Sequence, residues 1–381
     1  MGIGGKMRVV TMVGTRPEII KLSRVIAELD RHADHVLVHS GQNYDYELNQ
    51  IFFDDMGIRK PDYFLNAAGA TAAETIGNVI KASDEILEKL KPDAFLLLGD
   101  TNSCLSVISA KRRKIPIFHM EAGNRCFDQR VPEEINRKVV DHLSDINLVY
   151  TEHARRYLIS EGVRPETVIK TGSPMREVLE HYRNKIAASD VLGRLGLRPG
   201  AYFVVSAHRE ENVDKPERLE ALVALLAALK DRYGHPVIMS VHPRTQQRLQ
   251  SHPKNLQAGQ DGIHFLKPLG FSDYVQLQEN SFCVLSDSGT LTEEASILDF
   301  PAVMLREAHE RPEGMDEATV LMTGLSLERV LQGVALARAH HGEKREFHLV
   351  PDYEADNVSR KVVRLILSYS DYVRRTVWRE A

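Results

Sequence analysis

The sequence predicts an α/β protein of two domains, each built around a parallel β-sheet. Short aliphatic runs, typical of buried strands, alternate with amphipathic helical segments along the whole chain, and this alternation is typical of βαβ units. The chain has 381 residues, whereas an ordinary domain contains about 150. We therefore expect two Rossmann-like domains that face a central cleft.

The strands are predicted from runs of β-branched and aliphatic residues, and the helices from apolar residues at helical spacing. The expected strands lie at 8–13, 35–39, 94–98, 115–118, 146–150, 202–206, 237–241, 263–266, 282–285 and 302–305. The expected helices lie at 17–29, 71–90, 175–185, 216–233, 291–298 and 358–379. The alternation pauses between 172 and 200, so we place a domain boundary near Gly172. Residues 7–172 then form the first domain, completed by the C-terminal segment 358–381, and residues 173–357 form the second.

The amino-acid composition argues against several classes of protein and binding partner. Lys and Arg number 49 against 53 Asp and Glu, a net charge of −4, so the charge does not indicate nucleic-acid or membrane binding. No apolar run approaches the roughly 18 residues of a membrane span, and residues 1–6 lack the apolar core of a signal peptide. Cys104, Cys126 and Cys283 lie too far apart for a zinc or disulfide pattern. We expect a cytoplasmic protein without a metal site.

Charged residues follow the first expected strand, at the end where ligands bind in open α/β sheets. Pro17 opens a helix there, and the N–H groups at its start are expected to be free to attract an anion. Arg16 and Lys21 would add positive charge to such a site. An ordinary capped helix with a solvated Arg16 is the alternative. No Gly-x-Gly-x-x-Gly follows the strand, so a nicotinamide cofactor is not indicated.

Three acids follow strands of the first domain. Asp100 follows 94–98, Glu121 follows 115–118, and Glu133 lies in the first turn of the helix that Pro132 opens. Each acid alone could be a helix cap or a first-turn acid favoured by the helix dipole. At one edge of a sheet, however, mutual repulsion and burial would separate their pKa values and assign acid and base roles. The three together favour catalysis.

Cationic and proton-donating residues follow two strands of the second half. His208 comes after 202–206, and His242 and Arg244 come after 237–241. These groups suit a phosphate, because charged donors form the stronger hydrogen bonds to phosphate oxygens. A structural histidine is the alternative for His208, and a solvated loop is the alternative for the other two.

A loop of small residues follows the strand at 282–285. Ser288, Gly289 and Thr290 would let backbone N–H groups approach a diphosphate at a helix N-terminus, and Glu294 is placed to accept hydrogen bonds from ribose hydroxyls. A capped helix with surface acids is the alternative. Arg311, in the charged segment after 302–305, would lie on the same rim.

Together these blocks resemble the non-hydrolysing UDP-N-acetylglucosamine 2-epimerases over nearly the whole chain. The matching blocks are Gly14–Glu18 with Lys21, Gly99–Thr101, Glu121–Gly123, Pro132–Glu134 with Asn136 and Arg137, His208–Arg209, Asp287–Gly289 with Glu293 and Glu294, and Glu310–Glu313. The resemblance implies the two-domain GT-B type fold of nucleotide-sugar enzymes, a homodimer, a UDP-sugar substrate and no cofactor.

The resemblance also implies the reaction, which is C2 epimerisation of a UDP-N-acetylhexosamine for surface polysaccharide synthesis. UDP leaves by anti elimination, giving a 2-acetamidoglycal, and then adds back. By motif position, the catalytic residues are Asp100, Glu121, Glu133 and His208. The expected substrate-binding residues, from the motifs and from the residues that follow the strands, are Arg16, Lys21, Arg137, His242, Arg244, Tyr274, Ser288, Gly289, Thr290, Glu294 and Arg311, with Tyr274 a candidate for the uracil.

One segment departs from the pattern of family members that their own substrate regulates. Those members carry a Gln-His-Arg-type segment where this chain has Gly41–Leu48, so we expect no such regulation. With 124–130 and 209–213, this segment is closer to the branch that makes UDP-N-acetyl-L-fucosamine from the corresponding L-talosamine nucleotide. A GT-B glycosyltransferase, a hydrolase that releases free N-acetylmannosamine and a non-enzymatic nucleotide-sugar sensor are the alternatives.

Overall fold

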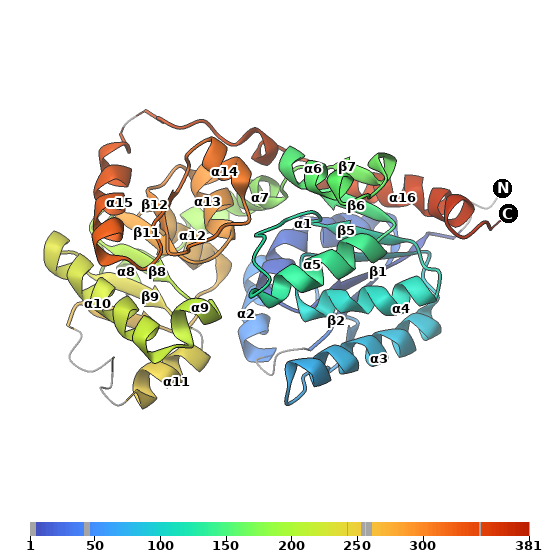
Figure 1. Ribbon diagram of the computed structural model, residues 1–381, viewed down its shortest axis with the longest axis horizontal. Coiled ribbons are helices and arrows are strands. Elements are labelled where there is room, and N and C mark those ends of the chain that lie inside the picture. The colour runs from blue at the N-terminus through green and yellow to red at the C-terminus, as the bar shows by residue number, and fades with distance from the viewer. Residues whose placement is uncertain are drawn as a thin grey trace. The chain divides into compact units, whose positions relative to one another are not determined.

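The computed structural model describes residues 5–41, 46–241, 243–252, 256, 261–342 and 344–380, with the backbone alone at 46–49, 210–211 and 243–244. The chain divides into two compact α/β units (Figure 1). Unit 1 comprises Met1–His181 and Asp352–Ala381, and unit 2 comprises Tyr182–Pro351. Each unit contains one parallel sheet. The predicted α/β class with two parallel sheets is confirmed.

The chain passes from unit 1 to unit 2 within helix α7 (Met175–Ala187), later than the boundary predicted near residue 172. The start of this helix and the residues before it bind the C-terminal segment. Ser173 N donates to Asp352 O at 3.1 Å, and Ser359 N donates to Glu177 at 2.8 Å. Because the C-terminal segment packs on unit 1, the residues that hold it belong to unit 1 as well.

Unit 1 contains a seven-stranded sheet with the strand order β3-β2-β1-β4-β5-β6-β7. Its strands are β1 (Arg8–Val13), β2 (Asp34–His39), β3 (Tyr63–Phe64), β4 (Ala94–Leu98), β5 (Ile117–Met120), β6 (Ile146–Val149) and β7 (Val168–Lys170). Its helices besides α7 are α1 (Arg16–His32), α2 (Tyr46–Met56), α3 (Ala72–Leu90), α4 (Val107–Arg112), α5 (Pro132–Leu143), α6 (Glu152–Ser160) and α16 (Val358–Thr376), with 3-10 turns η1 (Asn102–Ser106), η2 (Pro165–Thr167) and η3 (Pro351–Tyr353).

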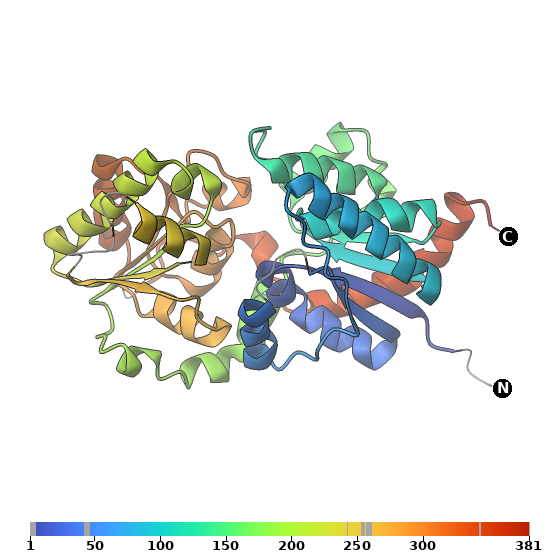
Figure 2. The same ribbon diagram turned by 90° about the horizontal axis from the view of Figure 1, so that it is seen from below.

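Helices cover both faces of this sheet. Helices α3, α4 and α5 lie on one face, where Val10 and Met12 of β1 pack with Leu87 of α3 (Figure 2). Helices α1 and α16 pack against each other on the other face. The central strands are therefore buried on both sides, which is why they read as continuous apolar runs in the sequence.

Unit 2 contains a six-stranded sheet with the strand order β10-β9-β8-β11-β12-β13. Its strands are β8 (Phe203–Ser206), β9 (Val237–Ser240), β10 (Ile263–Leu266), β11 (Cys283–Ser286), β12 (Ala302–Met304) and β13 (Leu321–Met322). Its helices are α8 (Val191–Arg194), α9 (Glu210–Val213), α10 (Pro216–Tyr233), α11 (Pro243–Ser251), α12 (Phe271–Glu279), α13 (Thr290–Leu298), α14 (Pro312–Asp316) and α15 (Leu327–Ala339).

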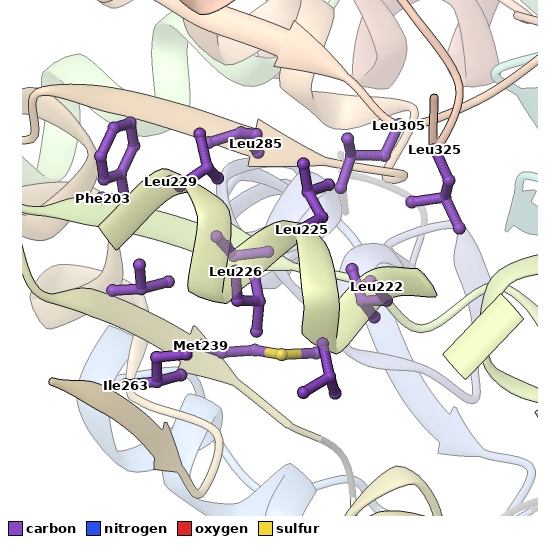
Figure 3. Close-up of a cluster of buried hydrophobic side chains, with 14 of the residues drawn as sticks. Phe203, Leu222, Leu225, Leu226, Leu229, Met239, Ile263, Leu285, Leu305 and Leu325 are labelled. Atoms are coloured by element: carbon purple, nitrogen blue, oxygen red, sulfur yellow. The ribbon is translucent and has the colours of Figure 1, made fainter. Parts of the chain in front are cut away.

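The apolar face of α10 forms the centre of one core of unit 2. Leu222, Leu226 and Leu229 pack with Met239 of β9 and Leu285 of β11 (Figure 3). All five side chains are buried. Burial of a leucine side chain contributes about 2 kcal/mol, so this row fixes the helix on the sheet that carries the second group of predicted site residues.

The strand order reverses at one place in each sheet. Strand β1 has β2 on one side and β4 on the other, and β8 has β9 and β11. In open α/β sheets ligands bind at the carboxyl ends of the strands at such a point. The residues that follow these strands are Gly14–Arg16 and Gly99–Thr101 in unit 1, and Ala207–Arg209 and Asp287–Gly289 in unit 2. Each of these segments contains residues or motif blocks that the sequence predicts for the site.

Some elements differ from the predictions. The short strands β3, β7 and β13 were not predicted, and α16 ends at Thr376 rather than 379. Two or three residues are too few to show an alternating pattern, and helix ends are the least defined part of a periodic signal. Within the part of the chain that the structure describes, we find no helix with the length and apolar character needed to cross a membrane.

Candidate functional site

Two of the predicted acids lie side by side at the carboxyl edge of the unit 1 sheet. Asp100 and Glu121 follow the neighbouring strands β4 and β5, whose last residues, Leu98 and Met120, pair in register. Each acid is bound by a cation from a helix. Arg137 Nε donates to Asp100 Oδ2 at 2.7 Å, and Arg137 Nη2 lies 2.6 Å from the same oxygen. Lys21 Nζ donates to Glu121 Oε2 at 2.5 Å. The cations fix the position of both carboxylates.

The turn that carries Glu121 has an unusual backbone. Glu121 has a φ of 61° and Gly123 a φ of 80°, so both residues are in the left-handed region. A Cβ at position 123 would lie 2.5 Å from Ala154 O, so only glycine fits there. A non-glycine residue in this region costs about 1 to 3 kcal/mol, and such residues occur often at functional sites.

The acids of α5 have different environments. Glu134 is fully buried and accepts hydrogen bonds from Cys126 N, Phe127 N and Arg137 Nη1, at 3.1, 3.2 and 3.0 Å. It therefore orders both the loop before the helix and the arginine that binds Asp100. Glu133 is half-buried, and among the described residues none forms a hydrogen bond or ion pair with its side chain. Its catalytic role stays a prediction. The contacts of Glu134 were not predicted from the sequence.

The turn after β1 bears on the predicted anion site at the start of α1. Two N–H groups just before the first helical residue are bonded to Glu18, because its side chain folds back over the start of α1. Gly14 N and Thr15 N donate to Glu18 Oε2 at 2.5 and 3.2 Å, and Thr101 Oγ1 donates to Glu18 Oε1 at 2.5 Å. These two backbone groups are therefore not available to a ligand. Arg16 lies over the ring of Phe52, 5.4 Å from its centre.

Glu18 gives a prediction on stability. Burial raises the pKa of Glu18 from 4.5 to about 7, against the opposing effect of its three hydrogen bonds. Between pH 4.5 and 7 the folded protein therefore keeps a proton that the unfolded chain has lost, so stability falls as the pH rises through this window. Wild type should lose about 3 kcal/mol more than Glu18→Gln over this range. Urea unfolding of both proteins at several pH values measures this difference in the free energy of unfolding. The same pH dependence in both proteins would contradict the prediction.

Asp287 is the centre of the corresponding edge of unit 2. It follows β11, is fully buried, and accepts hydrogen bonds from His208 N, Arg209 N and Asn212 Nδ2 at 3.1, 3.0 and 3.0 Å. His208 Nδ1 also lies 3.1 Å from its Oδ1. Burial raises the pKa of Asp287, but the charge of His208 and these hydrogen bonds outweigh it and lower the pKa to about 2. This carboxylate thus joins the residues after β8 to those after β11.

The small-residue loop leads into α13 as predicted. The helix starts at Thr290 after Gly289, and the Ser288 and Thr290 hydroxyl oxygens lie 2.9 Å apart. Glu294, in the second turn, accepts a hydrogen bond from Gln278 Nε2 at 2.7 Å. Thr290 N donates to Ser288 Oγ at 3.4 Å and Leu291 N to Ser288 O at 3.3 Å, so Ser288 already binds the first N–H groups of the helix. The start of a helix still carries partial positive charge, which suits a phosphate.

The remaining predicted residues of unit 2 lie in different settings. Arg311 is buried, with Nη2 3.3 Å from Glu293 Oε2. Tyr274 of α12 packs against a buried apolar cluster of this unit. His242 lies outside the described residues, as does the side chain of Arg244. Within the described ranges, no group of histidine, cysteine or acidic residues is arranged to hold a metal ion.

Comparisons with known proteins agree with the motifs. The family model described as UDP-N-acetylglucosamine 2-epimerase matches residues 27–367. A solved UDP-N-acetylglucosamine 2-epimerase from Rickettsia bellii is 57% identical, covering 98% of this chain and 100% of that one, with a TM-score of 0.92. The UDP-GlcNAc 2-epimerase from Methanocaldococcus jannaschii, solved in complex with UDP-GlcNAc and UDP, is 32% identical, covering 95% of this chain and 100% of that one, with a TM-score of 0.88.

A further relative is named for another sugar. The UDP-2,3-diacetamido-2,3-dideoxy-D-glucuronate 2-epimerase of Pseudomonas aeruginosa is 31% identical over 332 residues, which are 86% of this chain and 91% of that protein.

Proposed function

This chain belongs to the UDP-N-acetylglucosamine 2-epimerase family, and from that premise we propose that it inverts C2 of a UDP-N-acetylhexosamine without hydrolysing it. UDP-GlcNAc and UDP-ManNAc are the proposed pair. The observation that carries the proposal is that Asp100 and Glu121 lie at adjacent strand ends, each bound by a cation. Inversion at a carbon that bears hydrogen requires one group to take the proton and another to return one on the opposite face.

The proposed reaction is an elimination followed by an addition. A carboxylate of unit 1 takes the proton from C2, the electrons of that bond form the C1–C2 double bond, and the C1–O bond breaks with its electrons leaving on UDP. UDP then adds back to C1 through its β-phosphate oxygen, while C2 receives a proton on its other face. Asp100, Glu121 and Glu133 are the proposed acid–base residues, and His208 is proposed to protonate or orient the leaving oxygen. No redox step or cofactor is needed for this balance.

We assign UDP to unit 2. The support is that Ser288, Gly289 and Thr290 form the start of α13 and that His208 follows the neighbouring strand β8. Partial positive charge at a helix start stabilises phosphate oxygens. Glu294 is the proposed ribose ligand. The other proposed substrate-binding residues are Arg16, Lys21, Arg137, His242, Arg244, Tyr274 and Arg311.

The identity of the sugar has one specific alternative, UDP-2-acetamido-2,6-dideoxy-L-talose, which the same chemistry would convert to UDP-N-acetyl-L-fucosamine. Residues 124–130 and 209–213 favour it by sequence, together with Gly41–Leu48, part of which lies outside the described residues. The P. aeruginosa relative is named for yet another sugar, so family membership alone does not fix the hexosamine.

Substrate profiling tests the proposal. Each of the two nucleotide sugars is incubated with the protein, and the products are separated as UDP-linked and free sugars. We expect the UDP-linked manno epimer from UDP-GlcNAc. Turnover of the L-talose nucleotide alone would support the fucosamine branch, and free N-acetylmannosamine would support a hydrolase. Turnover of neither by folded protein that binds UDP would contradict the proposed function. The homodimer stays a prediction.

A further inference from the structure

Asp141 of α5 is another buried carboxylate of unit 1, and it does not belong to the predicted site. Its side chain is fully buried. Both of its oxygens lie 3.2 Å from Gly123 N, which donates to them, and Arg125 Nη1 donates to Oδ2 at 2.7 Å. Gly123 is two residues after Glu121, so Asp141 holds the left-handed turn that presents this acid.

The same carboxylate is connected to the turn that presents Asp100. His119, the penultimate residue of β5, lies with Nδ1 2.9 Å from Asp141 Oδ1. The opposite ring nitrogen, Nε2, lies 2.8 Å from Gly99 O. A carbonyl oxygen only accepts, so Nε2 carries the hydrogen. Gly99 N in turn donates to Met120 O at 3.0 Å, which joins the ends of β4 and β5 a second time.

The charge of Asp141 is compensated inside unit 1. Arg125 is fully buried at its side chain, and it also forms two hydrogen bonds with Glu161, at 2.9 and 2.7 Å. Burial raises the pKa of Asp141, but the contacts with His119 and Arg125 outweigh it and keep the pKa below its usual range. A buried charge with several partners is costly to disturb, so the turns it holds are held firmly.

We propose that Asp141, acting through His119 and Gly123, is the positioning residue that sets the separation and orientation of Asp100 and Glu121. Asp141 lies on the helix that also carries Arg137, the partner of Asp100. One carboxylate therefore links the end of β4, the end of β5 and α5. This inference rests on the proposed function, because it assigns Asp100 and Glu121 to the reaction.

Asp145 supplies a matched control. It is also a buried acid of unit 1, but it lies at the other end of β5, where it accepts hydrogen bonds from Ile117 N at 3.0 Å and from Lys111 Nζ at 2.5 Å. Asp141→Asn and Asp145→Asn each remove one buried negative charge without changing shape. Both should lower the thermal stability, and only the first should disturb the turns that present the acids.

The first readout is hydrogen–deuterium exchange of the full chain, which requires no substrate. In Asp141→Asn one carboxylate oxygen is replaced by an amide NH2 group, which only donates. The one remaining oxygen cannot accept from Gly123 N, Arg125 and His119 together. We expect faster exchange over residues 98–101 and 120–126 in this variant, and in Asp145→Asn faster exchange only near Ile117. Wild-type exchange at both turns in Asp141→Asn would overturn the inference.

The second readout is kinetic. Misplacement of the two acids should lower kcat by about 10- to 100-fold, with KM within about twofold of wild type, because the residues that bind UDP are unchanged. Asp145→Asn should keep the wild-type kcat. Equal kcat values for the two variants would overturn the inference, since a general loss of stability would then explain both.

The two readouts distinguish failure of the proposed function from failure of the inference about Asp141, and a second variant covers the case in which Asp141→Asn does not fold. If wild type turned over no UDP-N-acetylhexosamine, the proposed function would fail, while the exchange data would still decide whether Asp141 holds both turns. If Asp141→Asn did not fold, His119→Asn would replace it. That variant keeps a donor near Asp141 and removes the hydrogen bond to Gly99 O, so exchange should rise over 98–101 with the same loss of kcat. No change in either quantity would overturn the inference.

Discussion

Asp100→Asn is expected to lower kcat for C2 epimerisation by about 10³-fold, within the range by which a positioned acid or base accelerates proton transfer. The amide cannot take or return the C2 proton, yet it fills the same volume. Its oxygen can still accept a hydrogen bond from Arg137, which donates to Asp100 at 2.7 Å in the wild-type protein. We therefore expect KM for the nucleotide sugar to change little. Initial rates of epimer formation, followed by NMR, measure both quantities.

Asp93→Asn is the control for this prediction. Asp93 lies just before β4, at the end opposite Asp100, and it accepts hydrogen bonds from Arg8 N at 2.9 Å and Arg374 Nη2 at 2.8 Å. Its substitution should leave kcat at the wild-type value. If Asp100→Asn kept more than about a tenth of the wild-type kcat, a role in proton transfer would be excluded for this residue.

Asp287→Ala is expected to produce the second large effect, a loss of UDP affinity of at least about tenfold with a loss of about 3 kcal/mol in the free energy of unfolding. The substitution leaves three donors, the part-buried His208 N and Arg209 N and the buried Asn212 Nδ2, without their acceptor. It also removes the carboxylate that orients His208. Isothermal titration calorimetry with UDP and urea unfolding measure the two effects.

The contribution of Asp287 can also be measured from the pH dependence of the free energy of unfolding. The pKa of Asp287 is lowered from 3.8 to about 2, so its stabilising contribution is present above pH 3.8 and is lost as the pH falls toward 2. Asp287→Ala should lack this part of the acid transition. Asp299→Asn serves as the control, because Asp299 ends α13 in the left-handed conformation, which asparagine tolerates. Unchanged UDP affinity in folded Asp287→Ala would contradict the role assigned to this edge.

The fold was largely predictable because both sheets are buried on two sides. Residues 8–13 and 94–98 were predicted as strands with the bounds they have, since a central parallel strand is a continuous apolar run. The strand predicted at 115–118 is Ile117–Met120 instead. Pro116 has no N–H for the ladder, so the strand begins after it and Glu121 follows at once.

The site was predictable as a set of segments but not as a set of contacts. Asp100, Glu121, Lys21 and Arg137 could be selected because each follows a strand or lies in a matching motif. The pairing of Lys21 with Glu121 joins residues 100 positions apart, and local patterns carry no information on it. The role of Glu18 was missed because a capping acid and a ligand-binding turn have the same sequence signature.

Asp287 and Asp141 were not among the predicted site residues, for different reasons. Asp287 lies in a matching block and follows a buried strand, as Asp100 does, but no role was assigned to it. Asp141 lies within α5, where only the positions of His119, Gly123 and Arg125 in space show its importance. Such a network is a property of the folded chain.

Incubation of UDP-GlcNAc with the protein in deuterium oxide tests the central claim most directly, with the C2 proton followed by NMR. The account predicts that the UDP-linked manno epimer forms with deuterium at C2 and that the recovered UDP-GlcNAc gains deuterium as well. A manno epimer that kept the original C2 proton throughout would contradict deprotonation by the carboxylates of unit 1. No exchange and no epimer, from protein that binds the nucleotide sugar, would contradict the proposed reaction on this substrate.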